Sequence, residues 1–90
     1  MAKAPANTET IENYLKAIYT LARGSPAGEA GMKAIATLTG VTIGTASTMV
    51  RRMAATKLAK YERFGGVQLT AKGERAAVDV LRRHRLIETF

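Results

Sequence analysis

The sequence predicts a mostly α-helical domain with a small β-hairpin, and three observations near its centre support this fold class. Two short helical patterns, residues 32–38 and 43–53, flank a tight turn that contains Gly40. Two runs of strand character, residues 58–64 and 67–69, come next and are joined by a Gly-Gly pair. Two short helices on a tight turn form a helix-turn-helix, and a hairpin behind them is typical of a wing. We therefore expect a winged helix-turn-helix.

The chain has 90 residues, which suffices for one small domain with one modest core. We expect residues 1–7 to form a flexible N-terminal tail and residues 8–90 to form the winged helix-turn-helix domain. The last helical pattern continues to Phe90 without a Gly or Pro stop signal. We therefore expect a dimerisation or metal-binding region to follow this segment in a longer protein.

The first helix should be capped by Thr8 or Thr10 and should end at the stop signal that begins at Arg23. Its apolar residues recur at helical spacing and should face the core. They are Ile11, Tyr14, Leu15, Ile18, Leu21 and Ala22. Residues 27–31 should form a loop or a short edge strand.

The second and third helices form the helix-turn-helix itself. The second should bury Ile35 and Leu38, Gly40 should supply the turn, and Thr42 should cap the third helix. At about 100° per residue the third helix divides into two faces. The face expected in the core carries Ala46, Met49, Val50 and Met53, and the opposite face carries Gly44, Ser47, Thr48, Arg51 and Arg52.

The opposite face suits a DNA major groove. Small residues allow close approach to the groove floor, and arginines can reach phosphates or guanine edges. A simple solvated helix face is the alternative, but the position after a helix-turn-helix turn favours DNA. Lysine and arginine near the wing and the second helix should add contacts to phosphates. The candidate DNA-binding residues are Lys33, Thr42, Gly44, Thr45, Ser47, Thr48, Arg51, Arg52, Lys60 and Arg63.

The final helix should begin after a Thr70 cap and extend over residues 71–90. Its apolar residues are Ala77, Val80, Leu81, Ile87 and Phe90. His84 and Glu88 are spaced i and i+4, so they share one face, and this spacing is usable for two metal ligands. A histidine at the edge of the core, beside Val80 and Leu81, is the alternative interpretation of His84.

Charge and composition limit the possible functions. The formal net charge of +7 favours a polyanionic partner, because neutralising phosphates releases counterions. The absence of cysteine excludes disulfides and thiolate zinc sites, and no apolar run is long enough for a signal peptide or a membrane span. A cytoplasmic protein is expected. With one histidine, no Gly-rich phosphate loop and no paired carboxylates, the sequence does not predict an enzyme.

Four local motifs resemble one family of regulators. Residues 12–19 read Glu-Asn-Tyr-Leu-Lys-Ala-Ile-Tyr, and residues 45–53 read Thr-Ala-Ser-Thr-Met-Val-Arg-Arg-Met. Residues 69–73 read Leu-Thr-Ala-Lys-Gly, and residues 83–88 read Arg-His-Arg-Leu-Ile-Glu. Together they resemble the N-terminal half of the diphtheria-toxin-repressor family, the bacterial iron- and manganese-dependent transcriptional regulators.

This resemblance implies a repressor of double-stranded DNA that depends on Mn²⁺ or Fe²⁺ in its full-length form. It implies a homodimer only with downstream residues, and it implies that His84 and Glu88 are metal ligands. The first helix departs from the family pattern, because Asn13 replaces a methionine or aspartate ligand and Lys16 replaces a glutamate. Two ligands alone would not hold a metal tightly, so we expect no tight binding by this chain. A metal-independent winged-helix regulator and a winged-helix protein–protein module are the alternatives.

Overall fold

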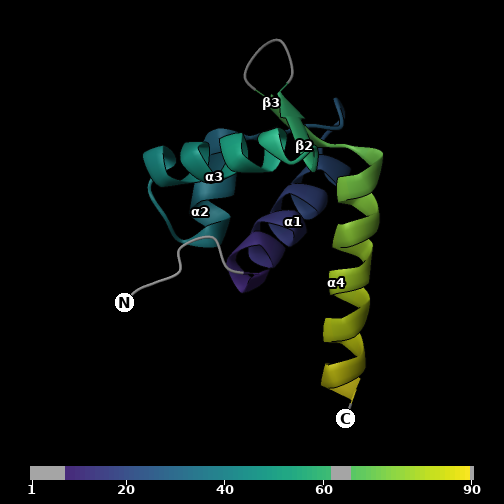
Figure 1. The fold of residues 1–90 in the computed structure, drawn as a ribbon. Coiled ribbons are helices and arrows are strands. Elements are labelled where there is room, and N and C mark those ends of the chain that lie inside the picture. The colour runs from purple at the N-terminus through teal and green to yellow at the C-terminus, as the bar shows by residue number, and fades with distance from the viewer. Residues whose placement is uncertain (1–7, 62–65, 90) are drawn as a thin grey trace.

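The computed structural model describes the backbone of residues 8–61 and 66–89, and the side chains of residues 10–61 and 66–83. Residues 1–7, expected as a tail, lie outside it. Figure 1 shows the arrangement of the secondary-structure elements. In chain order these are α1 (Thr8–Arg23), β1 (Ala30–Gly31), α2 (Met32–Thr39), α3 (Ile43–Ala55), β2 (Ala59–Tyr61), β3 (Gly66–Leu69) and α4 (Ala71–Thr89). This order confirms the expected mostly helical winged helix-turn-helix.

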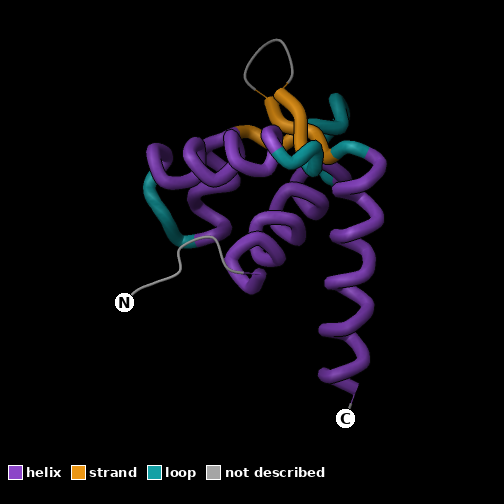
Figure 2. The backbone as a smooth tube through the Cα atoms, viewed as in Figure 1, coloured by secondary structure: helices purple, strands orange, loops and turns teal. Residues whose placement is uncertain are grey.

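The three strands form one small antiparallel sheet in the order β1-β3-β2. Ala30 of β1 and Tyr61 of β2 both lie opposite Val67 in the central strand, β3. The expected edge strand within residues 27–31 is therefore present as β1. Figure 2 shows the strands at one end of the helices. From the sheet, α4 runs back along α1, against which it packs. No helix within the described ranges is long and apolar enough to cross a membrane.

The expectation of a two-residue turn at Gly65-Gly66 is wrong. Such a turn would make the residue before it the partner of Val67, whereas Val67 pairs with Tyr61. The second glycine is already a strand residue. A Cβ at that position would overlap the side chain of Glu29, including its Cβ at 2.9 Å. This glycine therefore allows the chain before β1 to approach the sheet, a contact that local turn rules cannot foresee.

The hydrophobic core lies where the helices meet the sheet. The expected faces of α1 and α3 are buried there, including Tyr14 and Leu15 on α1 and all four expected residues of α3. The largest fully buried side chains are Ile18, Ile35, Val50, Met53, Val67 and Val80. The expected core positions Ile87 and Phe90 lie outside the residues whose side chains are described.

The expected burial of Leu38 is wrong, because this side chain is 55% exposed. The face of α2 that meets the core is centred between Ile35 and Ala36, and Leu38 lies about 100° away from that centre. Thr39 takes the half-buried position instead, and its hydroxyl donates a hydrogen bond to the Ile35 carbonyl (2.7 Å). The packing of α2 against α1 and α3, not its own apolar pattern, sets this rotation.

The helix-turn-helix turn is built as expected. Gly40 ends α2 in the left-handed region at φ +76°, where a side chain would be strained. Thr42 then caps α3, since its Oγ1 accepts a hydrogen bond from the Thr45 N–H (3.1 Å). These two residues fix where α2 ends and where α3 begins, and so they fix the start of the candidate recognition helix.

The start of α4 is tied to the segment before the wing. The Thr70 Oγ1 donates to the Lys57 carbonyl (2.6 Å) and accepts from the Gly73 N–H (3.0 Å), which confirms Thr70 as the cap of α4. The Thr70 N–H donates to the Leu58 carbonyl (3.1 Å). Gly73 is buried directly against that same carbonyl group. The Leu-Thr-x-x-Gly motif is therefore a close junction between two chain segments.

The C-terminus of α3 gives a stability prediction. Lys57 has φ +67°, while its N–H donates to the Ala54 carbonyl and the Leu58 N–H donates to the Met53 carbonyl. This Schellman arrangement favours glycine at the left-handed position. We expect Lys57→Gly to raise the free energy of unfolding by about 1 kcal/mol, measured by urea denaturation. Lys57→Ala keeps the Cβ and is the control; an equal gain in both variants would contradict the backbone explanation.

Candidate nucleic-acid interface

The two faces of α3 are as different as the sequence predicted. Ala46, Val50 and Met53 are fully buried and Met49 is nearly so. Gly44, Thr45, Thr48, Arg51 and Arg52 are exposed, and Ser47 is half-buried. The helix therefore presents a surface of small, hydroxyl and guanidinium groups that no other described element covers.

The threonine hydroxyls near the start of α3 are held in place by local hydrogen bonds. The Thr42 Oγ1 donates to the Thr45 Oγ1 (3.0 Å), and the Thr48 Oγ1 donates to the Gly44 carbonyl (3.1 Å). A hydroxyl has two acceptor lone pairs, so each remains able to accept from a further donor. These hydrogen bonds favour one rotamer for each of these exposed threonine side chains in the free chain.

Among the described residues, nothing requires glycine at position 44. A Cβ at this position would meet only the Thr42 Oγ1 at 3.9 Å, an ordinary contact, and the backbone is not in the left-handed region. Glycine inside a helix costs up to about 1 kcal/mol relative to alanine. The missing side chain leaves the surface of α3 open at this point.

The two arginines of α3 have different surroundings in the structure. Both are exposed, and neither makes an ion pair with another described residue. Arg52 lines a hollow of about 420 Å³ between α1 and α3, together with Tyr14, Thr45 and Thr48. Arg51 does not line this hollow. The Tyr14 hydroxyl in its floor is buried and has no hydrogen-bond partner among the described residues.

The other expected DNA-binding cations lie on three different elements. Lys33 is exposed in the first turn of α2, and Lys60 is exposed on β2. Arg63 lies outside the described residues. Lys33 and Lys60 also lack an ion-pair partner within the described part of the chain. Their charges are therefore not neutralised by described carboxylates.

One large apolar side chain that is exposed on α3 was absent from the sequence-based site. Ile43, the first residue of the helix, is 52% exposed. Helical spacing to Ala46 and Val50 suggests a core position, so periodicity alone gives no signal of exposure. Its position directly after the Thr42 cap, beside Gly44, is the feature that could have drawn attention to it.

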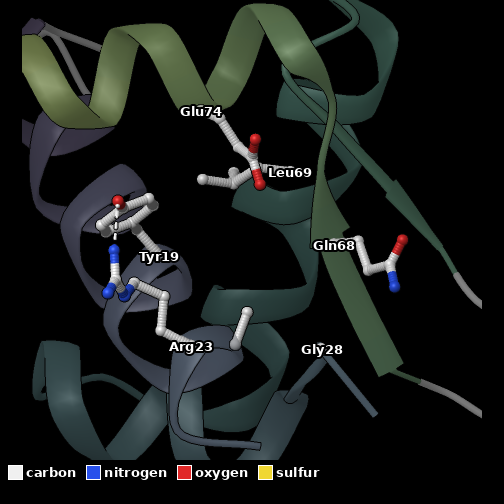
Figure 3. A pocket seen from close by; sticks show the side chains of 7 residues that line it. Tyr19, Arg23, Gly28, Gln68, Leu69 and Glu74 are labelled. Carbon is white, nitrogen blue, oxygen red and sulfur yellow. Dashed lines mark hydrogen bonds between the residues drawn. The ribbon is translucent and has the colours of Figure 1, made fainter.

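A second hollow, of about 220 Å³, lies between α1, β3 and α4 (Figure 3). The Arg23 guanidinium donates to the Tyr19 hydroxyl (2.8 Å) and lies over the Tyr19 ring, 5.4 Å from its centroid. Glu74 and Gln68 also line it, as Figure 3 shows. No residue of α3 contributes to this hollow, so it is separate from the candidate interface.

Residues 7–67 match the family described as "Iron dependent repressor, N-terminal DNA binding domain". The match covers α1, the helix-turn-helix and the start of the wing. The chain belongs to this family. The expected resemblance is therefore confirmed, and the family description names DNA binding as the role of this domain.

Several curated relatives are also similar along most of this chain. The Transcriptional regulator MntR of Escherichia coli O157:H7 is 35% identical over 82 residues, which is 91% of this chain and 52% of that relative. The HTH-type transcriptional regulator MntR of Bacillus subtilis (strain 168) is 30% identical over 83 residues, 92% of this chain and 57% of the relative. The chain spans about half the length of the relatives that it matches.

The iron named in the family description raises the question of metal ligands in this domain. Among the described residues no three carboxylate, histidine or cysteine side chains come together to hold a metal ion. Asn13 and Lys16 of α1 instead line a hollow with Leu38 and Thr39 of α2. An amide is a weak ligand and an ammonium cannot bind a cation, so these α1 residues do not fit a metal site.

His84 and Glu88 lie on α4, but their side chains are outside the described set. The described link between α1 and α4 near this point is an ion pair, in which Arg83 donates to Glu12 (2.9 Å). The pair joins the two helices one residue before His84. The assignment of His84 and Glu88 as ligands stays a prediction.

Proposed function

We propose that this chain is the DNA-binding domain of a metal-dependent transcriptional repressor and that α3 enters the major groove of double-stranded DNA. The observation that supports this proposal is the exposed face of α3, with its hydrogen-bonded hydroxyls and with two arginines that make no ion pair to another described residue. This face carries small residues at the start of α3, which suit contact with base edges, and arginines further along, which suit contact with phosphates. Binding to chromosomal DNA would place the protein in the cytoplasm, where we propose that it acts as a regulator without a catalytic role.

The proposed contacts follow from the position of each residue. Thr42, Gly44, Thr45, Ser47 and Thr48 belong nearest the bases and adjacent phosphates. Arg51 and Arg52 clamp the backbone, and the remaining phosphate contacts come from Lys33 on α2 and from Lys60 and Arg63 at the wing. We propose that the 90-residue chain alone is a monomer or at most a weak dimer, and that stable homodimerisation requires further residues in a longer protein.

Gly44→Ala tests this docking because it should change stability and DNA affinity in opposite directions. In the free chain the added Cβ makes only an ordinary contact, with the Thr42 Oγ1 at 3.9 Å, so the free energy of unfolding should rise by up to about 1 kcal/mol. In the complex the same Cβ would separate α3 from the groove, and affinity should fall about tenfold. Thermal melting and fluorescence anisotropy with a selected duplex measure the two effects.

Gly24→Ala is the matched control, because Gly24 is exposed after α1, outside the proposed interface, and a Cβ there would make only ordinary contacts of 3.7 Å or more. Its DNA affinity should equal that of the wild type. If Gly44→Ala bound DNA as tightly as the wild type, α3 would not approach the groove floor at this point. If the wild type bound no duplex at low salt, the proposed function itself would fail.

The metal response is proposed for the longer protein, with His84 and Glu88 as the ligands from this domain. We expect the 90-residue chain to bind DNA equally well with EDTA and with Mn²⁺, because two ligands leave most coordination positions open. Anisotropy titrations under the two conditions measure this. A marked gain in affinity with Mn²⁺ that His84→Ala removes would show that the domain binds metal alone.

A further inference from the structure

The start of α3 exposes one large apolar side chain, that of Ile43. Ile43 is the first residue of the helix and is 52% exposed. Its neighbours Thr42 and Gly44 are exposed as well. Isolated apolar residues are common on protein surfaces. This one, however, lies on the first turn of the helix proposed to read DNA.

Folding does not explain the choice of isoleucine at this position. Ile43 is not among the residues of the core or those packed against it. Its β-branched side chain is also a poorer helix former than alanine, glutamate or lysine. An isoleucine here therefore adds neither core packing nor helix propensity to the free chain, and its exposed side chain is available for contact with a partner.

The neighbouring residues make a close contact at this point possible. Gly44 has no side chain to hold α3 away from the groove floor. Ser47 lies one turn further on, at i+4 from Ile43, and is small and half-buried. A base edge approaching this turn would therefore meet the aliphatic Ile43 side chain, with only small neighbours in between.

We propose that Ile43 determines part of the sequence specificity by packing against the 5-methyl group of thymine in the major groove. Thymine is the only base that presents a methyl group there, and apolar side chains recognise it by contact. This inference rests on the proposed DNA-binding function. It predicts a preference for A·T pairs opposite the first turn of α3, in addition to any hydrogen bonds that the threonines make.

The test uses duplexes selected by the 90-residue chain from a random library, each then synthesised with thymine or with uracil. Uracil lacks only the methyl group and keeps the same hydrogen-bonding edge. We expect uracil at the contacted position to weaken wild-type binding about three- to fivefold, from the loss of one buried methyl. Substituting one thymine at a time locates that position.

Two variants separate the methyl contact from changes in DNA shape. Ile43→Ala should bind the thymine and uracil duplexes equally, and Ile43→Val should keep most of the difference. Leu38→Ala is the matched control, since Leu38 is similarly exposed (55%) but lies on α2, and it should discriminate like the wild type. Thermal melting of each variant checks that the fold is intact.

The outcomes distinguish this inference from the proposed function. Equal binding of both duplexes by the wild type, or an unchanged uracil effect in Ile43→Ala, would overturn the role of Ile43 while leaving DNA binding in place. Failure of the selection to enrich any sequence, together with no binding to duplex DNA, would instead overturn the proposed function on which the inference rests.

Discussion

Gly73→Ala is expected to destabilise the domain more than any other single substitution to alanine at a glycine. A Cβ at this position would lie inside the contact distance of the Leu58 carbonyl oxygen, 3.0 Å from the carbonyl carbon and 3.3 Å from the Leu69 Cβ. Backbone atoms cannot rotate away, so α4 would have to move. We expect a loss of about 3 kcal/mol in the free energy of unfolding. For a domain of this size the melting temperature would fall by about 12–24 °C.

Gly31→Ala is the matched control for this substitution. A Cβ on Gly31 would have no heavy atom within 4 Å, and its backbone is extended at φ −79°. The melting temperature of Gly31→Ala should differ little from that of the wild type. Circular dichroism at 222 nm, a wavelength that reports helix content, measures it. If the two variants melted together, the close contact between the start of α4 and Leu58 would not be a determinant of stability.

Local sequence rules predicted the elements whose causes are local. The Thr42 cap, the left-handed Gly40 and the apolar face of α3 each depend on residues within one or two turns. The rotation of α2, which exposes Leu38, depends on packing against other helices. The role of Gly66 depends on Glu29, which is far away in the sequence. Long-range contacts of this kind leave no mark in a local pattern.

The candidate site divides in the same way. Helical periodicity predicted which residues of α3 face away from the core, and the structure confirms the exposure of all of them except Ser47, which is half-buried. Periodicity did not distinguish Arg51 from Arg52. The two differ because Arg52 lines the hollow between α1 and α3 together with Tyr14, whereas Arg51 does not. It also gave no reason to select Ile43. The DNA contacts of all these residues remain proposals, for which exposure and charge are the support.

Replacing both Arg51 and Arg52 by alanine is expected to have the largest effect on DNA binding. Each guanidinium lacks an ion-pair partner among the described residues and can donate charge-assisted hydrogen bonds to a phosphate. Losing two such contacts, at about 1.5 kcal/mol or more each, should weaken binding by at least about 100-fold. The slope of log K against log salt should become shallower by about 1.8, or about 0.9 for each phosphate contact removed.

The control must remove the same charge from another surface. Arg75 and Arg82 are exposed on α4, where they line a hollow with Tyr19 and Arg23 that includes no residue of α3. Arg75→Ala combined with Arg82→Ala lowers the net charge equally, but beyond a Debye length of about 8 Å its effect is largely screened at physiological salt. Anisotropy titrations at several salt concentrations should therefore show a small loss for the α4 pair and a large one for the α3 pair. Equal losses would mean that net charge, not the docking of α3, drives binding. A slope that changes by only about 0.9 in the α3 variant would mean that one arginine contacts a base edge instead of a phosphate.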